Sequence, residues 1–186
     1  MKKIFILLFA ALNIFLFSSQ PYADIIVDTG TPSTSGPAIS GGSPYPVQWA
    51  SAEFNIPSPG YSLTNVEGYL KNNYWEGRQL FIEIRTGQGE VPSNTTLYSG
   101  TFTIPAFTTG WVGINGMQGW ELTPGDYWVV FGNLVPGTYV NVMWFAPNPL
   151  GDEAWYQNGT WWEDDGWDIG VKISGNPLSI TPIPEP

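Results

Sequence analysis

Residues 80–104 read LFIEIRTGQGEVPSNTTLYSGTFTI, two alternating runs joined by a polar, glycine-containing turn. The apolar side chains of the first run recur at every second position: Leu80, Ile82 and Ile84. The second run repeats that period: Tyr98, Gly100, Phe102 and Ile104. A period of two with β-branched and aromatic residues is the pattern of a strand that buries one face. This stretch therefore predicts two strands around the turn at 87–92.

The same pattern extends outward in both directions. Further short runs rich in Val, Ile and aromatic residues begin at the following positions: Gln48, Val66, Tyr127, Val140 and Ile169. The 22 glycines and 17 prolines leave few uninterrupted windows long enough for a helix. Strands at this spacing, without helices between them, pair antiparallel and bury one face each. We predict an all-β fold, an antiparallel two-sheet β-sandwich of jelly-roll type.

The N-terminus has the layout of a secretory signal peptide. Lys2 and Lys3 precede an apolar stretch, Ile4–Phe17, which is followed by polar residues and the small residue Ala23. The predicted organisation is a signal peptide at 1–23, a flexible N-terminal segment at 24–44, a single β-sandwich domain at 45–175 and an extended tail at 176–186. We expect a secreted or cell-envelope location and no transmembrane helix in the mature chain.

Composition excludes several classes of function. The net charge is −10, and removal of Lys2 and Lys3 with the signal peptide makes it −12. Only four Lys and Arg remain against sixteen Asp and Glu, too few to neutralise nucleic-acid phosphates, so nucleic-acid binding is not expected. The absence of cysteine removes disulfides and thiolate chemistry. The absence of histidine removes the commonest general base and transition-metal ligand, so we expect no enzyme.

The last residues, Pro182-Ile183-Pro184-Glu185-Pro186, resemble the opening of a PEP-CTERM sorting signal. In that family Pro-Glu-Pro is followed by a membrane helix and a basic cluster, and an exosortase processes the tail. The sequence ends at the motif, without these two parts. The resemblance implies exosortase as a partner through Pro184-Glu185-Pro186.

The body of the chain is similar to the β-sandwich choice-of-anchor domains that accompany this signal. Three segments carry the likeness: Gln48–Phe54, Leu122–Val129 and Ala154–Ile173. The resemblance implies an exported surface or matrix protein of a Gram-negative bacterium that produces exopolysaccharide. It implies no catalytic residues.

Ten tryptophans are the most unusual feature of the composition. The predicted ligand-binding residues form the densest aromatic group: Trp144, Trp155, Tyr156, Trp161, Trp162 and Trp167. Exposed indole faces suit sugar rings, whereas buried indoles would supply the core of a cysteine-free sandwich. Trp161 and Trp162 are adjacent, so on a strand they point to opposite sides and at least one is expected to be exposed.

Carboxylates suggest two further hypotheses. The run at 163–168 contains Asp164, Asp165 and Asp168 on a glycine-containing loop, which suits calcium, although a solvated turn has the same composition. Acid pairs for glycoside hydrolysis are Glu83 with Glu90 or Glu153 with Glu163, but neither pair is aligned by one strand face.

The predicted function is a non-catalytic exported protein of the cell surface or extracellular matrix, with a glycan-binding module for exopolysaccharide. One alternative is a purely structural matrix protein without a discrete ligand. A carboxylate-based glycoside hydrolase is the other.

Overall fold

The computed structural model describes residues 23–164 and 166–179. The signal peptide predicted at 1–23, apart from Ala23, lies outside the described residues, as do Asp165 and the motif at 184–186. Thirteen strands and no helix occur in the described part of the chain. The strands are β1 (Asp24–Asp28), β2 (Thr34–Gly41), β3 (Val47–Ile56), β4 (Tyr61–Lys71), β5 (Arg78–Gly87), β6 (Pro92–Ile104), β7 (Thr109–Asn115), β8 (Glu121–Leu122), β9 (Gly125–Asn133), β10 (Tyr139–Trp144), β11 (Glu153–Gln157), β12 (Thr160–Glu163) and β13 (Val171–Pro177).

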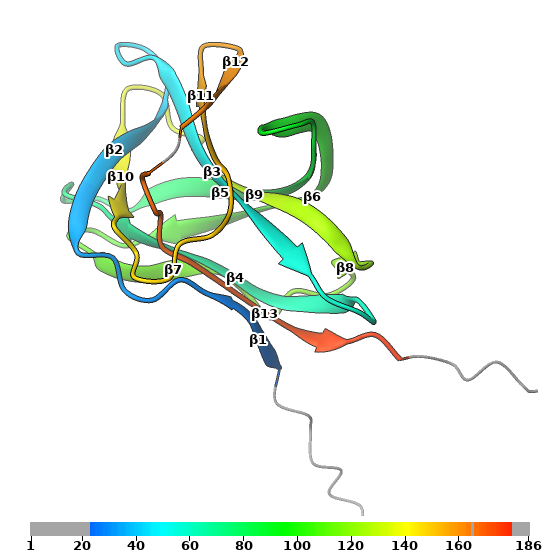
Figure 1. Ribbon diagram of the computed structural model, residues 1–186. Helices are drawn as coiled ribbons and strands as arrows, with labels where there is room; N and C mark the ends of the chain where they lie inside the picture. Colours follow the sequence, from blue (N-terminus) through cyan, green and yellow to red (C-terminus); the bar gives the residue numbers. More distant parts are fainter. Residues whose placement is uncertain (1–22, 165, 180–186) are drawn as a thin grey trace, which may run out of the picture.

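All thirteen strands belong to one branched antiparallel network of hydrogen bonds. The main path runs β1-β13-β4-β10-β2-β3-β9-β5-β6, with β7 and β8 added to β4, and β11 and β12 added at β3 (Figure 1). The hairpin predicted at 80–104 is β5–β6, in which Leu80 lies opposite Phe102 and Ile84 opposite Tyr98. The prediction of an all-β antiparallel fold is confirmed, and the jelly-roll connectivity stays a prediction.

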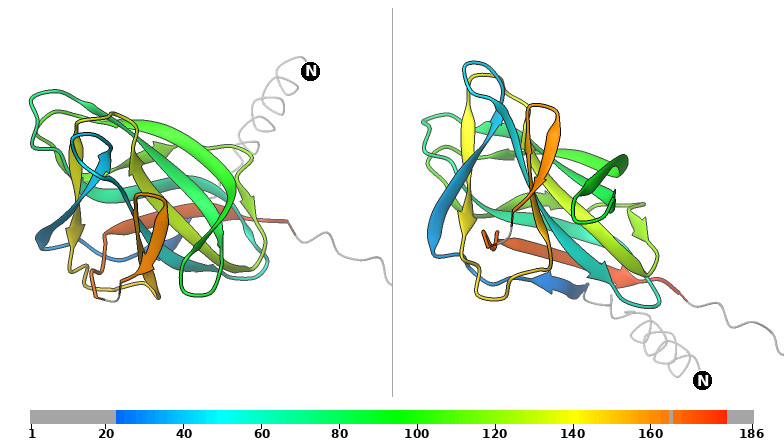
Figure 2. Two further views of the ribbon diagram at one scale, coloured as in Figure 1. Left: turned by 90° about the horizontal axis from the view of Figure 1, so that it is seen from above. Right: turned by 45° about the horizontal axis from the view of Figure 1, so that its top comes forward.

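The network folds over to give two layers, one around β4 and β13 and the other around β9 and β5 (Figure 2). A methyl group placed on Gly68 of β4 would lie 2.9 Å from the Phe131 ring of β9, so the two layers meet there. The core residues come from both layers and include Val66, Leu70, Ile82, Val129, Val140 and Ile173. Because the chain has no disulfide, this packed interior carries the stability.

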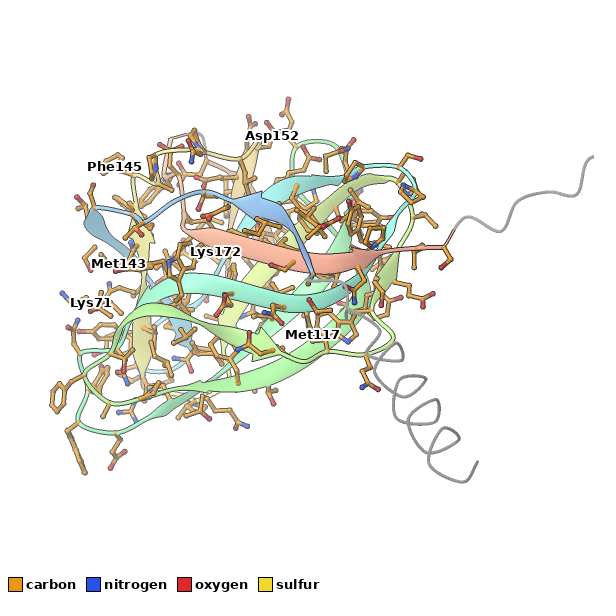
Figure 3. The ribbon with its side chains drawn as sticks, turned by 90° about the horizontal axis from the view of Figure 1, so that it is seen from below. Lys71, Met117, Met143, Phe145, Asp152 and Lys172 are labelled. Carbon is orange, nitrogen blue, oxygen red and sulfur yellow. The ribbon has the colours of Figure 1, made fainter. Side chains whose placement is uncertain are left out.

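The segment 24–44 differs from the flexible segment that we predicted. It forms β1 on β13 and β2 on β10, and Ile39 is fully buried in the core. The Gly, Pro, Ser and Thr content of this segment does not indicate strands, because β1 and β2 are held mainly by backbone hydrogen bonds to their neighbours. Figure 3 shows Lys172 on β13 and Lys71 at the end of β4, both in the layer that β1 extends. Within the described residues no helix long and apolar enough to cross a membrane is found.

Candidate functional site

The β11–β12 hairpin places most of the predicted aromatic residues. Its two-residue turn, Asn158-Gly159, has positive φ at both residues, the conformation that matches hairpin twist. Asn158 ties the turn to β3: its backbone N–H donates to the Val47 carbonyl at 3.1 Å, and the Val47 N–H donates to the Asn158 side chain at 3.2 Å. The hairpin thereby extends the β3 edge as a fixed pair of strands.

The hairpin register separates the predicted residues into two faces. Tyr156 lies opposite Trp161, and Trp155 lies opposite Trp162. Directly opposed residues share a face and neighbours along a strand do not. The predicted ligand-binding group is therefore divided between two surfaces. One carries Tyr156 and Trp161, and the other carries Trp155 and Trp162.

On the first face, aromatic rings pack on one another. Trp49 of β3 stacks on Tyr156 with ring centroids 4.1 Å apart, and Trp161 meets Tyr156 at 5.1 Å. The Arg85 guanidinium carbon lies 5.6 Å from the Trp49 ring and 5.8 Å from the Trp161 ring. Its Nε donates to Glu83 Oε2 at 2.7 Å. Arg85 is buried, and with Trp49, Tyr156 and Trp161 it forms what we call the cation–π cluster.

On the second face, three of the predicted tryptophans fill the space between β10 and β11. Trp155 stacks on Trp167 at 6.2 Å, and Trp144 meets Trp167 nearly perpendicular. The pocket among them has about 10 Å³ of free space, about the volume that one water needs. These three rings pack against each other rather than line an open surface. Trp162, on the same face, remains 60 % exposed.

Glu153 binds the backbone of the segment that carries Trp167. It is 6 % exposed, and its carboxylate accepts three backbone N–H groups: Trp167 at 3.1 Å, Asp168 at 2.8 Å and Ile169 at 2.7 Å. Burial raises the pKa of Glu153 to about 7, and the nearby Asp168 charge raises it too, against the lowering effect of the N–H groups. The carboxylate is thus a structural anchor for residues 167–169.

The acidic run lies beside this anchor. Asp164 N–H donates to the Glu153 carbonyl at 3.0 Å, and Asp168 has a φ of 48°. Within the described residues no group of three or more acidic side chains is arranged to hold a metal, and Asp165 lies outside them. The calcium site stays a prediction.

The two members of each carboxylate pair considered for hydrolysis lie in different surroundings. Glu163 lies opposite Ala154, so it is on the opposite face of the hairpin from Glu153. Glu83 is ion-paired with Arg85 at 2.5 Å, while Glu90 is exposed in the β5–β6 turn.

A groove that we did not predict lies beside the β2–β3 turn, and this turn is at the top of the molecule in Figure 1. It has a volume of about 330 Å³, and we call it the tyrosine groove; its lining residues are Ala38, Ser40, Tyr45, Gln48 and Tyr139. The Tyr45 and Tyr139 rings meet edge to face with centroids 5.4 Å apart. Tyr74 packs on the other side of Tyr139 at 5.3 Å.

The loops that carry these tyrosines are tied together. The Gly42 carbonyl accepts both the Tyr45 N–H at 3.2 Å and the Gly137 N–H at 3.1 Å. Burial raises the pKa of Tyr74, as do the neighbouring Tyr139 and Tyr45. The sequence gives only a weak indication of the tyrosine groove. Tyr139 falls on the face of its strand opposite the core residues Val140 and Val142, where polar residues are also common.

No protein-family model matches the chain, and no curated protein matches it either.

Proposed function

We propose that this chain is a non-catalytic, exported surface or matrix protein that binds a glycan in the tyrosine groove. One observation supports the site above all: the groove combines concave volume, two partly exposed aromatic rings and several hydroxyl and amide groups. Pockets for small ligands have this character, an apolar lining with a few polar groups that fix orientation.

The chemistry of the lining suits a sugar. Tyr45 is 41 % exposed, so its ring is open to the apolar face of a pyranose. The Gln48 amide both donates and accepts hydrogen bonds, which matches the hydroxyl groups of a saccharide. Because Gly42 holds the two loops before any ligand arrives, binding loses little conformational entropy.

The test is binding of immobilised glycans by the purified chain and its variants. Tyr45→Ala and Gln48→Ala should each weaken binding about tenfold, a change of about 1.4 kcal/mol. The matched control is Tyr69→Ala, which removes a partly buried tyrosine that packs edge to face on Trp111 at 5.2 Å, outside the groove. Equal losses in all three variants, or no retained glycan, would contradict the proposal and favour a structural matrix protein.

A second assay addresses the proposed absence of catalysis. Incubation with each bound polysaccharide should release no reducing sugar. Steady release that is lost in Glu83→Gln or Glu153→Gln would instead make the chain a carboxylate glycosidase.

Export and sorting are part of the same proposal and are supported by the sequence pattern at the two ends. The secreted protein should begin near Asp24. N-terminal sequencing of material from the culture medium or envelope checks this, and recovery of the uncut chain in the cytosol alone would contradict it. Replacement of Glu185 in the Pro184-Glu185-Pro186 motif tests the proposed recognition by an exosortase.

A further inference from the structure

Five strands contribute one residue each to a continuous row that includes the tyrosine groove. The register places Tyr139 opposite Ser40, Ser40 opposite Gln48, Gln48 opposite Gln157, and Gln157 opposite Thr160. Directly opposed residues share a face, and adjacent strands are about 4.8 Å apart, so the row is about 19 Å long. It lies near the β2–β3 and β11–β12 turns at the top of Figure 1.

Each end of the row leads to an exposed tryptophan. At one end the Tyr139 ring contacts Tyr74, and the next residue, Trp75, is 72 % exposed. At the other end Thr160 shares its face with Trp162, two residues further along β12. Of the tryptophans in the described residues, Trp75 and Trp162 are the two exposed ones. An exposed indole thus lies near each end of a polar row.

The row carries no charged side chain. Its members are tyrosine, serine, two glutamines and threonine. Arg78, beside Tyr74, lies 4.5 Å from the Tyr74 ring and is paired with Glu76 at 3.2 Å. Lys71 is opposite Asn141, two residues from Tyr139 along β10, and is not a member of the row. The whole chain has a net charge of −10, so an anionic polymer would be repelled and would find no unpaired cation in the row.

We propose that the tyrosine groove is the middle of a track for an uncharged polysaccharide chain, laid across the strands from Trp75 to Trp162. This inference rests on the glycan binding proposed above, and it names the ligand class as a long neutral polymer. Tyr139, Gln48, Gln157 and Thr160 hydrogen-bond the middle of the polysaccharide chain. Ser40 is buried and donates to the Pro46 carbonyl, so it holds the row in place without contacting the ligand. The two indoles stack on sugar rings near the ends. A short oligosaccharide fills the groove alone.

The experiment compares short and long forms of one neutral glycan, such as cellotriose and hydroxyethyl cellulose, followed by calorimetry and tryptophan fluorescence. Polygalacturonate is the anionic comparison. Trp75→Ala and Trp162→Ala should each weaken polymer binding about fivefold, the loss of one ring contact, and leave the trisaccharide unchanged. Tyr45→Ala should weaken both. The matched control is Ile25→Ala, which removes a highly exposed apolar side chain on β1, outside the row.

Three outcomes would overturn the track. Equal affinity for trisaccharide and polymer, with both tryptophan variants unchanged, would leave a groove for a short glycan and refute only the longer track. Tighter binding of polygalacturonate, weakened by salt, would refute the uncharged class. The failure of every saccharide to bind the wild-type chain would refute the glycan function together with the track.

Discussion

Trp161 and Trp162 are neighbours in the chain but lie on opposite faces of the β11–β12 hairpin. Trp161 is opposite Tyr156 in the cation–π cluster, whereas Trp162 is opposite Trp155 and 60 % exposed. The prediction that at least one of the pair is exposed is confirmed. The reason is the two-residue period of a strand, which sends adjacent side chains to opposite sides.

Trp162→Ala should therefore change the free energy of unfolding by no more than about 0.5 kcal/mol, as is usual for exposed positions. Trp128→Ala should cost about 3–5 kcal/mol, because its fully buried indole would leave a cavity. Chemical denaturation of both variants measures the difference. Similar large losses would mean that Trp162 is part of the packed interior.

Glu153 makes stability depend on pH. Its pKa is about 7 in the folded protein and about 4.5 in the unfolded chain, so the folded state binds more protons between these values. Stability is then greatest below about pH 4.5, falls as pH rises through 7 and levels off above. The difference from this group is on the order of 3 kcal/mol.

Thermal melts between pH 5 and pH 8 measure this dependence. Glu153→Gln should flatten the fall, although it weakens the contacts to the backbone of residues 167–169. Glu53 should contribute to the pH dependence with the same sign, because burial and the charges of Asp152 and Asp126 raise its pKa as well. A melting temperature that rises from pH 5 to pH 8 would contradict the role given to Glu153.

Gly113 of β7 allows close approach to β4. A methyl group on Gly113 would lie 2.0 Å from the Val66 carbonyl oxygen, and backbone cannot move aside as a flexible side chain does. We expect Gly113→Ala to cost about 1–3 kcal/mol. Gly110 in the same strand is the matched control, since a methyl group there meets nothing within 4 Å. Equal melting temperatures for the two variants would show that β7 does not pack as described.

The predicted calcium site at Asp164, Asp165 and Asp168 has a direct test. An ion that binds only the folded state raises its melting temperature, so millimolar calcium should raise the melt above that in chelator. Asp168→Asn should reduce the shift. An identical melt in calcium and chelator would identify the run as a solvated loop.

Much of the fold could be predicted because the alternation of apolar and polar residues along a strand indicates which side chains are buried. The runs around Leu80–Arg85 and Tyr127–Phe131 each have a core face that recurs at every second residue, and both are strands in the structure. The segment at 24–44 could not be predicted in this way. It contributes few buried side chains and is positioned by backbone hydrogen bonds to β13 and β10, which leave little trace in side-chain pattern.

The sequence by itself determined that this chain is rich in short strands, acidic, free of cysteine and histidine, and unusually rich in tryptophan. Tertiary structure alone decided what those tryptophans do. Register divided Tyr156 and Trp161 from Trp155 and Trp162. Backbone hydrogen bonds from the residues after β10 to the loop at 167–168 packed Trp144 against Trp167. It also aligned Tyr139, Ser40 and Gln48 from three strands. Side-chain pattern sets which face of a strand is buried, but which strands become neighbours depends on contacts far apart in the chain.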